Sequence, residues 1–183
     1  GAFSIYANKG VYNAPMMVTK IEDKYGNVLA NFYPESREVI TENTAFLMAN
    51  LLQGVVDEGT GRRLRFRYGF KNQIGGKTGT TQNHSDGWFI GITPDLAGGV
   101  WVGAEDRSIH FQNLANGQGA SMALPIWAKF LLKAYADPRL KMSDRPFDRP
   151  AGINKRLDCD ETISEAEAKE MNKSLREDEE EFY

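Results

Sequence analysis

Four consecutive residues, Lys77-Thr78-Gly79-Thr80, combine groups that could bind a carboxylate and polarise a neighbouring carbonyl. The lysine ammonium is a cation with three donors, and each threonine hydroxyl can donate a hydrogen bond. Gly79 has no side chain, so a substrate backbone can approach closely there. At a strand edge, the backbone N–H of Thr80 could donate to a developing oxyanion, which typically contributes about a hundred- to a thousandfold in rate. The tetrad therefore suits the carboxylate anchor and the oxyanion site of an acyl-transfer centre.

Three short strands, at residues 74–81, 87–93 and 98–103, are predicted to present this tetrad. Pro94-Asp95 is a turn signal between the last two, which indicates an antiparallel hairpin. Within residues 87–93 both alternating sets of side chains contain apolar residues. Helices are therefore expected on both faces of the sheet.

Two amphipathic helices are predicted to provide that cover. Thr41 can cap a helix that runs to about Asp57, because apolar residues recur there at helical spacing. A second helix is predicted from about Ser121 to Ala136. Pro125 is tolerated only in the first turn of a helix, so the regular part of this helix is expected to begin late.

The N-terminal part of the chain predicts a short helix followed by a hairpin. Residues 3–7 are helix-like and largely apolar, and Gly10 is a stop signal. The runs 18–23 and 28–33 flank the Gly-Asn pair at 26–27, which is a hairpin signal. Because the chain opens inside a helix-like stretch and has no initiator Met, we expect it to be an excised piece of a longer protein. The lack of an anchor here would then say nothing about the parent.

Composition argues against several classes of function. The net charge of −3 offers no basic field for nucleic acid. No apolar run approaches the roughly 20 residues that cross a bilayer, and Cys159 is the only cysteine, so no internal disulfide can form. His84 and His110 lack partners at ligand spacing, so we expect surface or structural roles and predict neither metal nor other cofactor. His84 is near enough to the tetrad to line the rim of a cleft.

Two segments allow other interpretations. Gly76-Lys77-Thr78 resembles part of a phosphate-binding loop, but that motif needs Gly where Lys71 stands and a helix directly afterwards. The basic, aromatic segment 62–68 could contact glycan or acidic partners, or it could be an exposed loop that leads into the next strand.

A series of motifs follows in order along residues 1–136. They are Ala7-Asn8-Lys9-Gly10-Val11-Tyr12; Ile21-Glu22-Asp23 with Gly26-Asn27-Val28-Leu29; Thr44-Ala45-Phe46-Leu47-Met48; Gly54-Val55-Val56 with Gly59-Thr60-Gly61; Gly76-Lys77-Thr78-Gly79-Thr80-Thr81; Trp88-Phe89, Gly91 and Thr93-Pro94-Asp95; Val100-Trp101-Val102-Gly103; and Pro125-Ile126-Trp127. Their order and spacing resemble the C-terminal part of the transpeptidase domain of class A, bifunctional penicillin-binding proteins. Of that family's motifs, S-x-x-K, S-x-N and K-T-G, only the third occurs in this chain.

The resemblance implies an α+β fold, a fragment of the penicillin-binding and serine β-lactamase-like transpeptidase fold, with an antiparallel sheet flanked by helices. It implies that residues 1–140 form the C-terminal part of the transpeptidase domain. Residues 141–183 are expected to form an irregular strap and an acidic tail whose composition is typical of disorder. The family cross-links peptidoglycan stem peptides by serine acyl transfer, and β-lactams trap its serine.

The resemblance also implies roles within the tetrad. Lys77, Thr78 and Thr80 match the positions that hold the carboxylate of substrate or drug, and Gly79 lies beside the substrate backbone. The Thr80 N–H matches the part of the oxyanion hole that this strand contributes. The parent is implied to carry a membrane anchor and a glycosyltransferase domain, and to act in the cell envelope on the extracytoplasmic face of the cytoplasmic membrane, in the periplasm.

The catalytic serine, its lysine partner and the serine of the second motif would lie upstream of Gly1, together with two early strands of the sheet. The isolated chain is therefore predicted not to react with penicillin, and its exposed sheet edge predicts self-association. Two other interpretations stay open. One is a non-catalytic binding or scaffold module of the cell envelope. The other is a relative of β-lactamases or D,D-carboxypeptidases, and rapid drug turnover by the parent would favour a β-lactamase.

Overall fold

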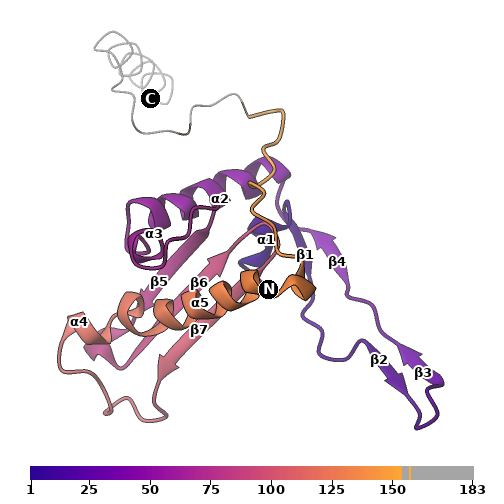
Figure 1. Ribbon diagram of the computed structural model, residues 1–183, viewed down its shortest axis with the longest axis horizontal. Helices are drawn as coiled ribbons and strands as arrows, with labels where there is room; N and C mark the ends of the chain where they lie inside the picture. The colour runs from indigo at the N-terminus through magenta and orange to yellow at the C-terminus, as the bar shows by residue number, and fades with distance from the viewer. Residues whose placement is uncertain (154–156, 158–183) are drawn as a thin grey trace, which may run out of the picture. The chain divides into compact units, whose positions relative to one another are not determined.

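The computed structural model describes residues 1–153 and residue 157. Its central element is a three-stranded antiparallel sheet in the order β5-β6-β7 (Figure 1). The strands are β5 (Gly75–Thr80), β6 (Asp86–Ile92) and β7 (Ala97–Gly103). In the register of the sheet Lys77 lies opposite Ile90. The three strands confirm the sequence-based prediction for this segment.

Thr93 forms the turn between β6 and β7. Its side-chain oxygen accepts hydrogen bonds from the backbone N–H groups of Asp95 and Leu96, at 3.3 and 3.0 Å. Its own N–H donates to the Leu96 carbonyl at 2.8 Å. Thr93 is fully buried, so these bonds satisfy polar groups that water cannot reach.

Helix α5 (Gly119–Ala136) covers one face of the sheet. The rings of Phe89 and Trp127 meet edge to face, with centroids 5.3 Å apart, and the Trp127 indole N–H donates to the Gly98 carbonyl at 3.1 Å. A Cβ added at Gly91 would lie 2.3 Å from the Trp127 ring. The helix can lie this close to β6 only because Gly91 has no side chain.

Helix α2 (Glu42–Asp57) lies beside β5. Thr41 caps it as predicted, because its hydroxyl oxygen accepts the Thr44 N–H at 3.3 Å. The helix packs tightly against the strand, since a Cβ at Gly75 would lie 3.0 Å from the Leu52 Cβ.

The second face of the sheet is covered only at one end. There α2 and the short helix α1 (Ser4–Ala7) form a small cluster around Ile92. Farther along the same face Trp88 and Trp101 pair across β6 and β7 and remain 45% and 47% exposed. Within the part of the chain that the structure describes, helices thus cover the whole α5 face of the sheet but only one end of the opposite face. The expectation of helices over both faces is confirmed for the α5 face and only in part for the other.

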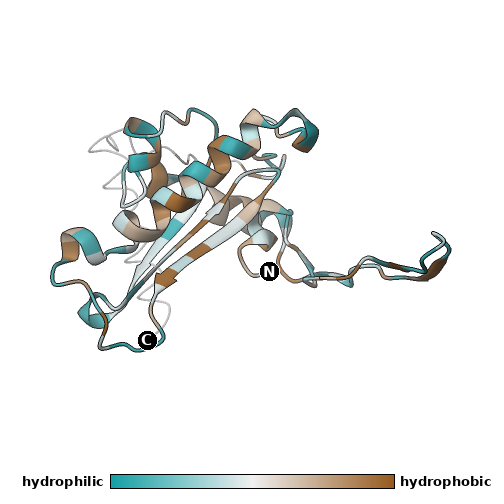
Figure 2. Ribbon diagram, turned by 60° about the horizontal axis from the view of Figure 1, so that its bottom comes forward, coloured by the Kyte–Doolittle hydropathy of each residue, from teal (hydrophilic) through white to brown (hydrophobic). Residues whose placement is uncertain are grey.

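Two small antiparallel ribbons precede α2. They are β1 (Val11–Asn13) with β4 (Ser36–Glu38), and β2 (Lys20–Glu22) with β3 (Val28–Asn31). The second is the predicted hairpin, and Asp23 forms its turn by accepting the backbone N–H groups of Tyr25 and Asn27 at 2.8 and 2.9 Å. Figure 2 shows apolar residues among hydrophilic ones along this hairpin. The β1–β4 pair was not predicted, because three-residue strands carry almost no periodic signal.

Short helical turns complete the fold. They are α3 (Arg63–Phe66), η1 (Gln82–His84), α4 (Leu114–Gly117) and η2 (Pro138–Leu140). The prediction for α5 was wrong in one respect, because the helix begins at Gly119 and Pro125 lies in its second turn. The helix tolerates this proline although it lacks the N–H that would bond the Ser121 carbonyl.

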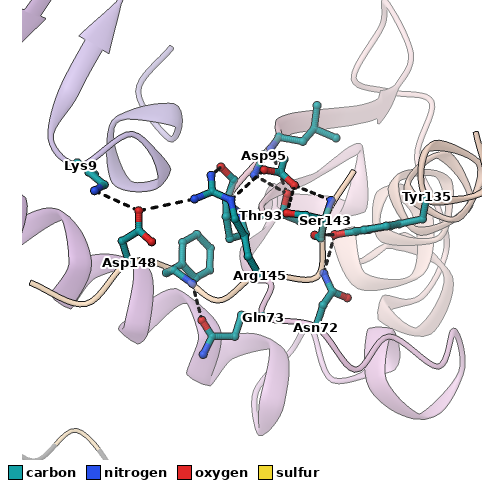
Figure 3. Close-up of polar contacts among 12 residues, drawn as sticks. Lys9, Asn72, Gln73, Thr93, Asp95, Tyr135, Ser143, Arg145 and Asp148 are labelled. Carbon is teal, nitrogen blue, oxygen red and sulfur yellow. Dashed lines mark hydrogen bonds and ion pairs between the residues drawn. The ribbon is translucent and has the colours of Figure 1, made fainter. Parts of the chain in front are cut away.

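Residues 141–150, which we call the strap, lie outside helices and strands and are fixed by polar contacts (Figure 3). Asp95 accepts hydrogen bonds from the N–H and the hydroxyl of Ser143 at 2.8 and 2.7 Å, and pairs with Arg145 at 3.2 Å. The Phe147 N–H donates to the Gln73 side chain at 2.8 Å, and the Phe147 side chain is buried. These contacts fix the strap on the turn after β6 and on the α2 cluster.

The described residues, 1–153 together with 157, include no helix that is both long and apolar enough to cross a membrane. The acidic tail and Cys159 lie outside the described residues. Helices combined with antiparallel sheets make the chain an α+β protein, as predicted.

Candidate active site

Strand β5 divides the polar side chains of the tetrad between two faces. Because side chains alternate along a strand, Thr78 and Thr80 share one face and Lys77 lies on the other. Thr78 is opposite Phe89, whose ring packs on α5, so the two threonines lie on the α5 side. The tetrad therefore brings together the two hydroxyls and places the ammonium across the strand from them.

The Thr80 N–H points away from the sheet. The Thr81 N–H donates to the Asp86 carbonyl at 3.1 Å. In an antiparallel ladder, residues that bond to the neighbouring strand alternate with residues that do not. Thr80 thus directs its N–H to the outer edge of β5, the edge that carries no strand in the described part of the chain.

Lys77 is exposed, and its ammonium donates to the Thr78 carbonyl at 2.8 Å. It forms no ion pair within residues 1–153 and 157. Its charge is held near the strand edge by a neutral partner, so the ammonium has donors left for an anion.

Both threonine hydroxyls already have partners within the chain. The Thr78 and Thr60 oxygens are 2.8 Å apart, and Thr60 belongs to the loop between α2 and α3. The Thr80 oxygen accepts the N–H of Gly119, the first residue of α5, at 3.1 Å. A hydroxyl that accepts a hydrogen bond keeps its own proton for a ligand.

Gly119 is needed where α5 meets β5. A Cβ at this position would lie 2.3 Å from the Trp88 carbonyl oxygen and 2.4 Å from that of Gly79. The absence of a side chain lets the positive end of the α5 dipole lie beside Thr80. The sequence predicted a helix from about Ser121 and gave no sign that Gly119 contacts the tetrad.

The basic segment 62–68 contains the short helix α3, and only part of it is exposed. Arg63 donates to the Ala120 carbonyl and to the Ser121 hydroxyl, both at 2.9 Å, and Arg65 pairs with Asp57 at 2.6 Å. The prediction of an exposed loop was wrong for Arg63 and Arg65, because these two arginines fix helix α3 against α5 and α2. Arg62, Phe66 and Arg67 are exposed, as that prediction expects. Sequence periodicity could not reveal contacts that depend on distant segments.

The two histidines are not brought together as a ligand pair. His110 Nδ1 lies 3.0 Å from the Phe111 carbonyl oxygen. His84 follows Asn83 in the turn after β5, and both have left-handed backbones with φ of 55° and 60°. Among the described residues, no group of three His, Cys, Asp or Glu side chains is placed to hold a metal ion.

The phosphate-loop interpretation does not fit the geometry. Lys77 and Thr78 lie inside a strand that continues to Thr80, whereas a phosphate-binding loop places this pair at the start of a helix. The backbone N–H groups here serve a sheet and its edge instead of enclosing an anion.

Comparison with known proteins identifies the fold. Residues 1–123 match the family described as "Penicillin binding protein transpeptidase domain". Penicillin-binding protein 1A of Aquifex aeolicus is 35% identical over 130 residues, which are 71% of this chain and 17% of that protein. Penicillin-binding protein 1A of Clostridium novyi is 38% identical over 101 residues, which are 55% of this chain and 12% of that protein.

Solved structures agree with these matches at the level of the fold. The crystal structure of penicillin-binding protein 1A from Haemophilus influenzae superposes with a TM-score of 0.72 at 23% identity, over 82% of this chain and 27% of that one. Penicillin-binding protein A of M. tuberculosis, solved as an imipenem acyl-enzyme complex, superposes with a TM-score of 0.56 at 21% identity, over 72% of this chain and 29% of that one. The chain thus spans less than a fifth of the length of the two sequence relatives above. It belongs to the penicillin-binding protein transpeptidase domain family, with class A penicillin-binding proteins as its relatives.

Proposed function

We propose that this chain is the C-terminal part of a D,D-transpeptidase domain that cross-links peptidoglycan and is acylated by β-lactams. Its contribution is the strand that binds the substrate carboxylate and donates to the oxyanion. The observation that carries the proposal is the Thr80 N–H directed to the open edge of β5, beside a cation that has no ion-pair partner among the described residues. The domain would occupy residues 1–140, followed by the strap and tail at 141–183.

A stem peptide would bind along the outer edge of β5 as an added strand. Its terminal carboxylate would interact with Lys77, Thr78 and Thr80, and Gly79 would leave room for the peptide backbone. A charged hydrogen bond contributes about 1.5–3 kcal/mol, so the loss of the Lys77 ammonium is expected to weaken binding markedly.

The chemistry would be a two-step acyl transfer. A serine oxygen from the parent attacks the carbonyl of the penultimate D-Ala, and the C–N bond to the terminal D-Ala breaks as that residue leaves with a proton. An amine of a second stem peptide then attacks the acyl-enzyme, loses a proton, and releases the serine. In both steps the Thr80 N–H would stabilise the tetrahedral oxyanion.

The nucleophile would come from outside these 183 residues, because the chain has neither S-x-x-K nor S-x-N. We therefore propose that the isolated chain does not react with penicillin and that the complete protein does. A membrane-anchored parent with a glycosyltransferase domain, acting at the extracytoplasmic face of the cytoplasmic membrane, completes the proposal. It rests on the similarity to class A penicillin-binding proteins.

A substrate assay on the complete protein tests this function. A stem peptide ending in D-Ala–D-Ala would be supplied with and without an acceptor amine, and released D-Ala and cross-linked product would be quantified. Transpeptidation predicts both D-Ala and an amine adduct. D-Ala release with hydrolysis alone would indicate a D,D-carboxypeptidase, rapid β-lactam turnover would indicate a β-lactamase, and no release would favour a scaffold module.

A further inference from the structure

We propose that Thr60 is a positioning residue that orients the Thr78 hydroxyl toward the carboxylate of the substrate or drug. The inference rests on the proposed function of β5. It starts from a single contact, the 2.8 Å separation of the Thr60 and Thr78 side-chain oxygens, which joins residues 18 apart in the sequence. Thr60 lies in the Gly59-Thr60-Gly61 loop after α2, outside the tetrad.

Proton counting gives the contact a direction. Each hydroxyl has one proton to donate and two lone pairs that accept. If Thr78 donates its proton to Thr60, it has none for a carboxylate. If Thr60 donates to Thr78, the Thr78 proton is free to point at the ligand. Carboxylate binding therefore selects the order Thr60 to Thr78 to carboxylate, and hydrogen bonds in such a chain strengthen one another.

The backbone around Thr60 is fixed well enough for this role. The Gly61 N–H donates to the Val55 carbonyl at 2.9 Å, and the Arg62 N–H donates to the Gly59 carbonyl at 3.2 Å. Gly61 is buried, and a Cβ there would lie 3.1 Å from the Val55 carbonyl oxygen. The loop is thus folded back on the end of α2, and Thr60 is presented to β5 from a backbone with little freedom.

A second set of contacts ties this loop to the other threonine of the site. Arg63, three residues after Thr60, donates to the Ala120 carbonyl and the Ser121 hydroxyl in the first turn of α5. Gly119, which begins the same turn, donates its N–H to the Thr80 oxygen. Thr78 is therefore held by the α2–α3 loop and Thr80 by α5, and Arg63 links these two supports.

The test measures acylation of the complete protein by a penicillin and by its methyl ester, which lacks the carboxylate. Thr60→Val keeps the shape of the side chain and removes the donor, and Thr60→Ser restores it. Thr60→Val is expected to lower the acylation rate constant for penicillin about three- to tenfold, as for loss of one neutral hydrogen bond. Thr60→Ser is expected to restore it. Thr19→Val, in the exposed arm before β2, is the matched control and is expected to change nothing.

A positioning role and a merely structural role for Thr60 predict different results. If Thr60 acts through Thr78, Thr60→Val has no further effect on a Thr78→Val background and none on the slow reaction of the methyl ester. An equal loss with the ester, or the same loss with and without Thr78, would overturn the inference. Thermal unfolding of each variant shows whether it folds. If Thr60→Val does not fold, the acylation rate of Thr60→Ser decides, because the inference requires Thr60→Ser to react as fast as wild type.

Failure of the proposed function looks different from failure of this inference. If the wild-type complete protein reacts with penicillin but Thr60→Val reacts equally fast, only the role of Thr60 is wrong. If the wild-type protein does not react, the proposed function and the role of Thr60 are wrong together.

Discussion

At the scale of single residues, the proposed role of the tetrad involves its backbone as well as its side chains. Lys77 and the two threonines lie on opposite faces of β5, so in the proposed complex they would approach the carboxylate from two sides of the same strand edge. Strand alternation makes this division predictable from the sequence. The partners of the hydroxyls, Thr60 and Gly119, were not predictable, because both contacts depend on how separate elements pack.

Two substitutions at Thr80 separate the effect of its backbone N–H from the effect of its hydroxyl. Thr80→Pro removes the N–H, and an edge strand whose N–H faces outward tolerates proline. Thr80→Val keeps the N–H and loses only the hydroxyl. We expect the Pro variant of the complete protein to react with penicillin about a hundredfold or more slowly than the Val variant, the usual effect of one oxyanion donor. Stopped-flow acylation rates measure this, and equal rates for the two variants would argue against an oxyanion role.

At the scale of elements, the longer helices, the sheet strands and their turns were predictable, and most of the shortest helices and strands were not. Helix α2 has a capping threonine and helical periodicity, and the strands have turn signals between them. Helix α3 and the β1–β4 pair were missed, since each is held by contacts with distant segments rather than by a repeating pattern. Pro125 misled the prediction for α5 because propensity rules ignore the packing that holds its second turn.

Contact between α5 and β5 depends on Gly119. Gly119→Ala would place a methyl group against the carbonyl oxygens of Trp88 and Gly79, and overpacking of this kind typically costs about 1–3 kcal/mol. Gly54 in α2 is the matched control, since a Cβ there meets nothing within 4 Å. Gly54→Ala is expected to stabilise the chain by up to about 1 kcal/mol. Thermal unfolding of both variants checks the pair, and equal effects would contradict this packing.

Asp95 accepts hydrogen bonds from the strap and pairs with Arg145. Hydrogen bonds from Ser143, with help from Arg145, lower the pKa of the Asp95 carboxyl below its ordinary value of 3.8. A lowered pKa means that ionised Asp95 stabilises the fold above pH 3.8, and that this contribution is lost as the pH falls below that value.

Asp95→Asn measures that contribution. We expect it to lower the Tm of the chain at pH 7, and we expect the difference from wild type to shrink as the pH falls below 3.8, because Asp95 becomes protonated in the folded chain as well. Asp144→Asn, on the same strap, is the control. A difference between Asp95→Asn and wild type that persists unchanged at pH 2 would show that the strap does not depend on the charge of Asp95.

At the scale of the whole molecule, the described chain has open surfaces that a complete domain would be expected to cover. Both outer edges of the sheet lack partner strands in the described residues. The exposed Trp88–Trp101 pair lies on the sheet face opposite α5. Exposed edges and apolar faces promote pairing between chains.

The isolated chain is therefore expected to self-associate. Size-exclusion chromatography with light scattering should give a mass above the 20.5 kDa of one chain. Trp101→Lys should shift the population toward monomer, whereas Tyr33→Lys, which changes an exposed aromatic residue outside the sheet, should not. A clean monomer for the unmodified chain would refute this expectation.

In the proposed function, β5 holds the carboxylate of a penicillin that acylates the complete protein. The most direct measurement is intact mass spectrometry of the complete protein after brief exposure to penicillin, with Lys77→Ala compared against Lys71→Ala, an exposed lysine just upstream of the strand. We expect one adduct on wild type and on the Lys71 variant, and a sharply weaker adduct on the Lys77 variant. An adduct of equal strength on all three would remove Lys77 from the site, and no adduct on any of them would contradict the proposed function.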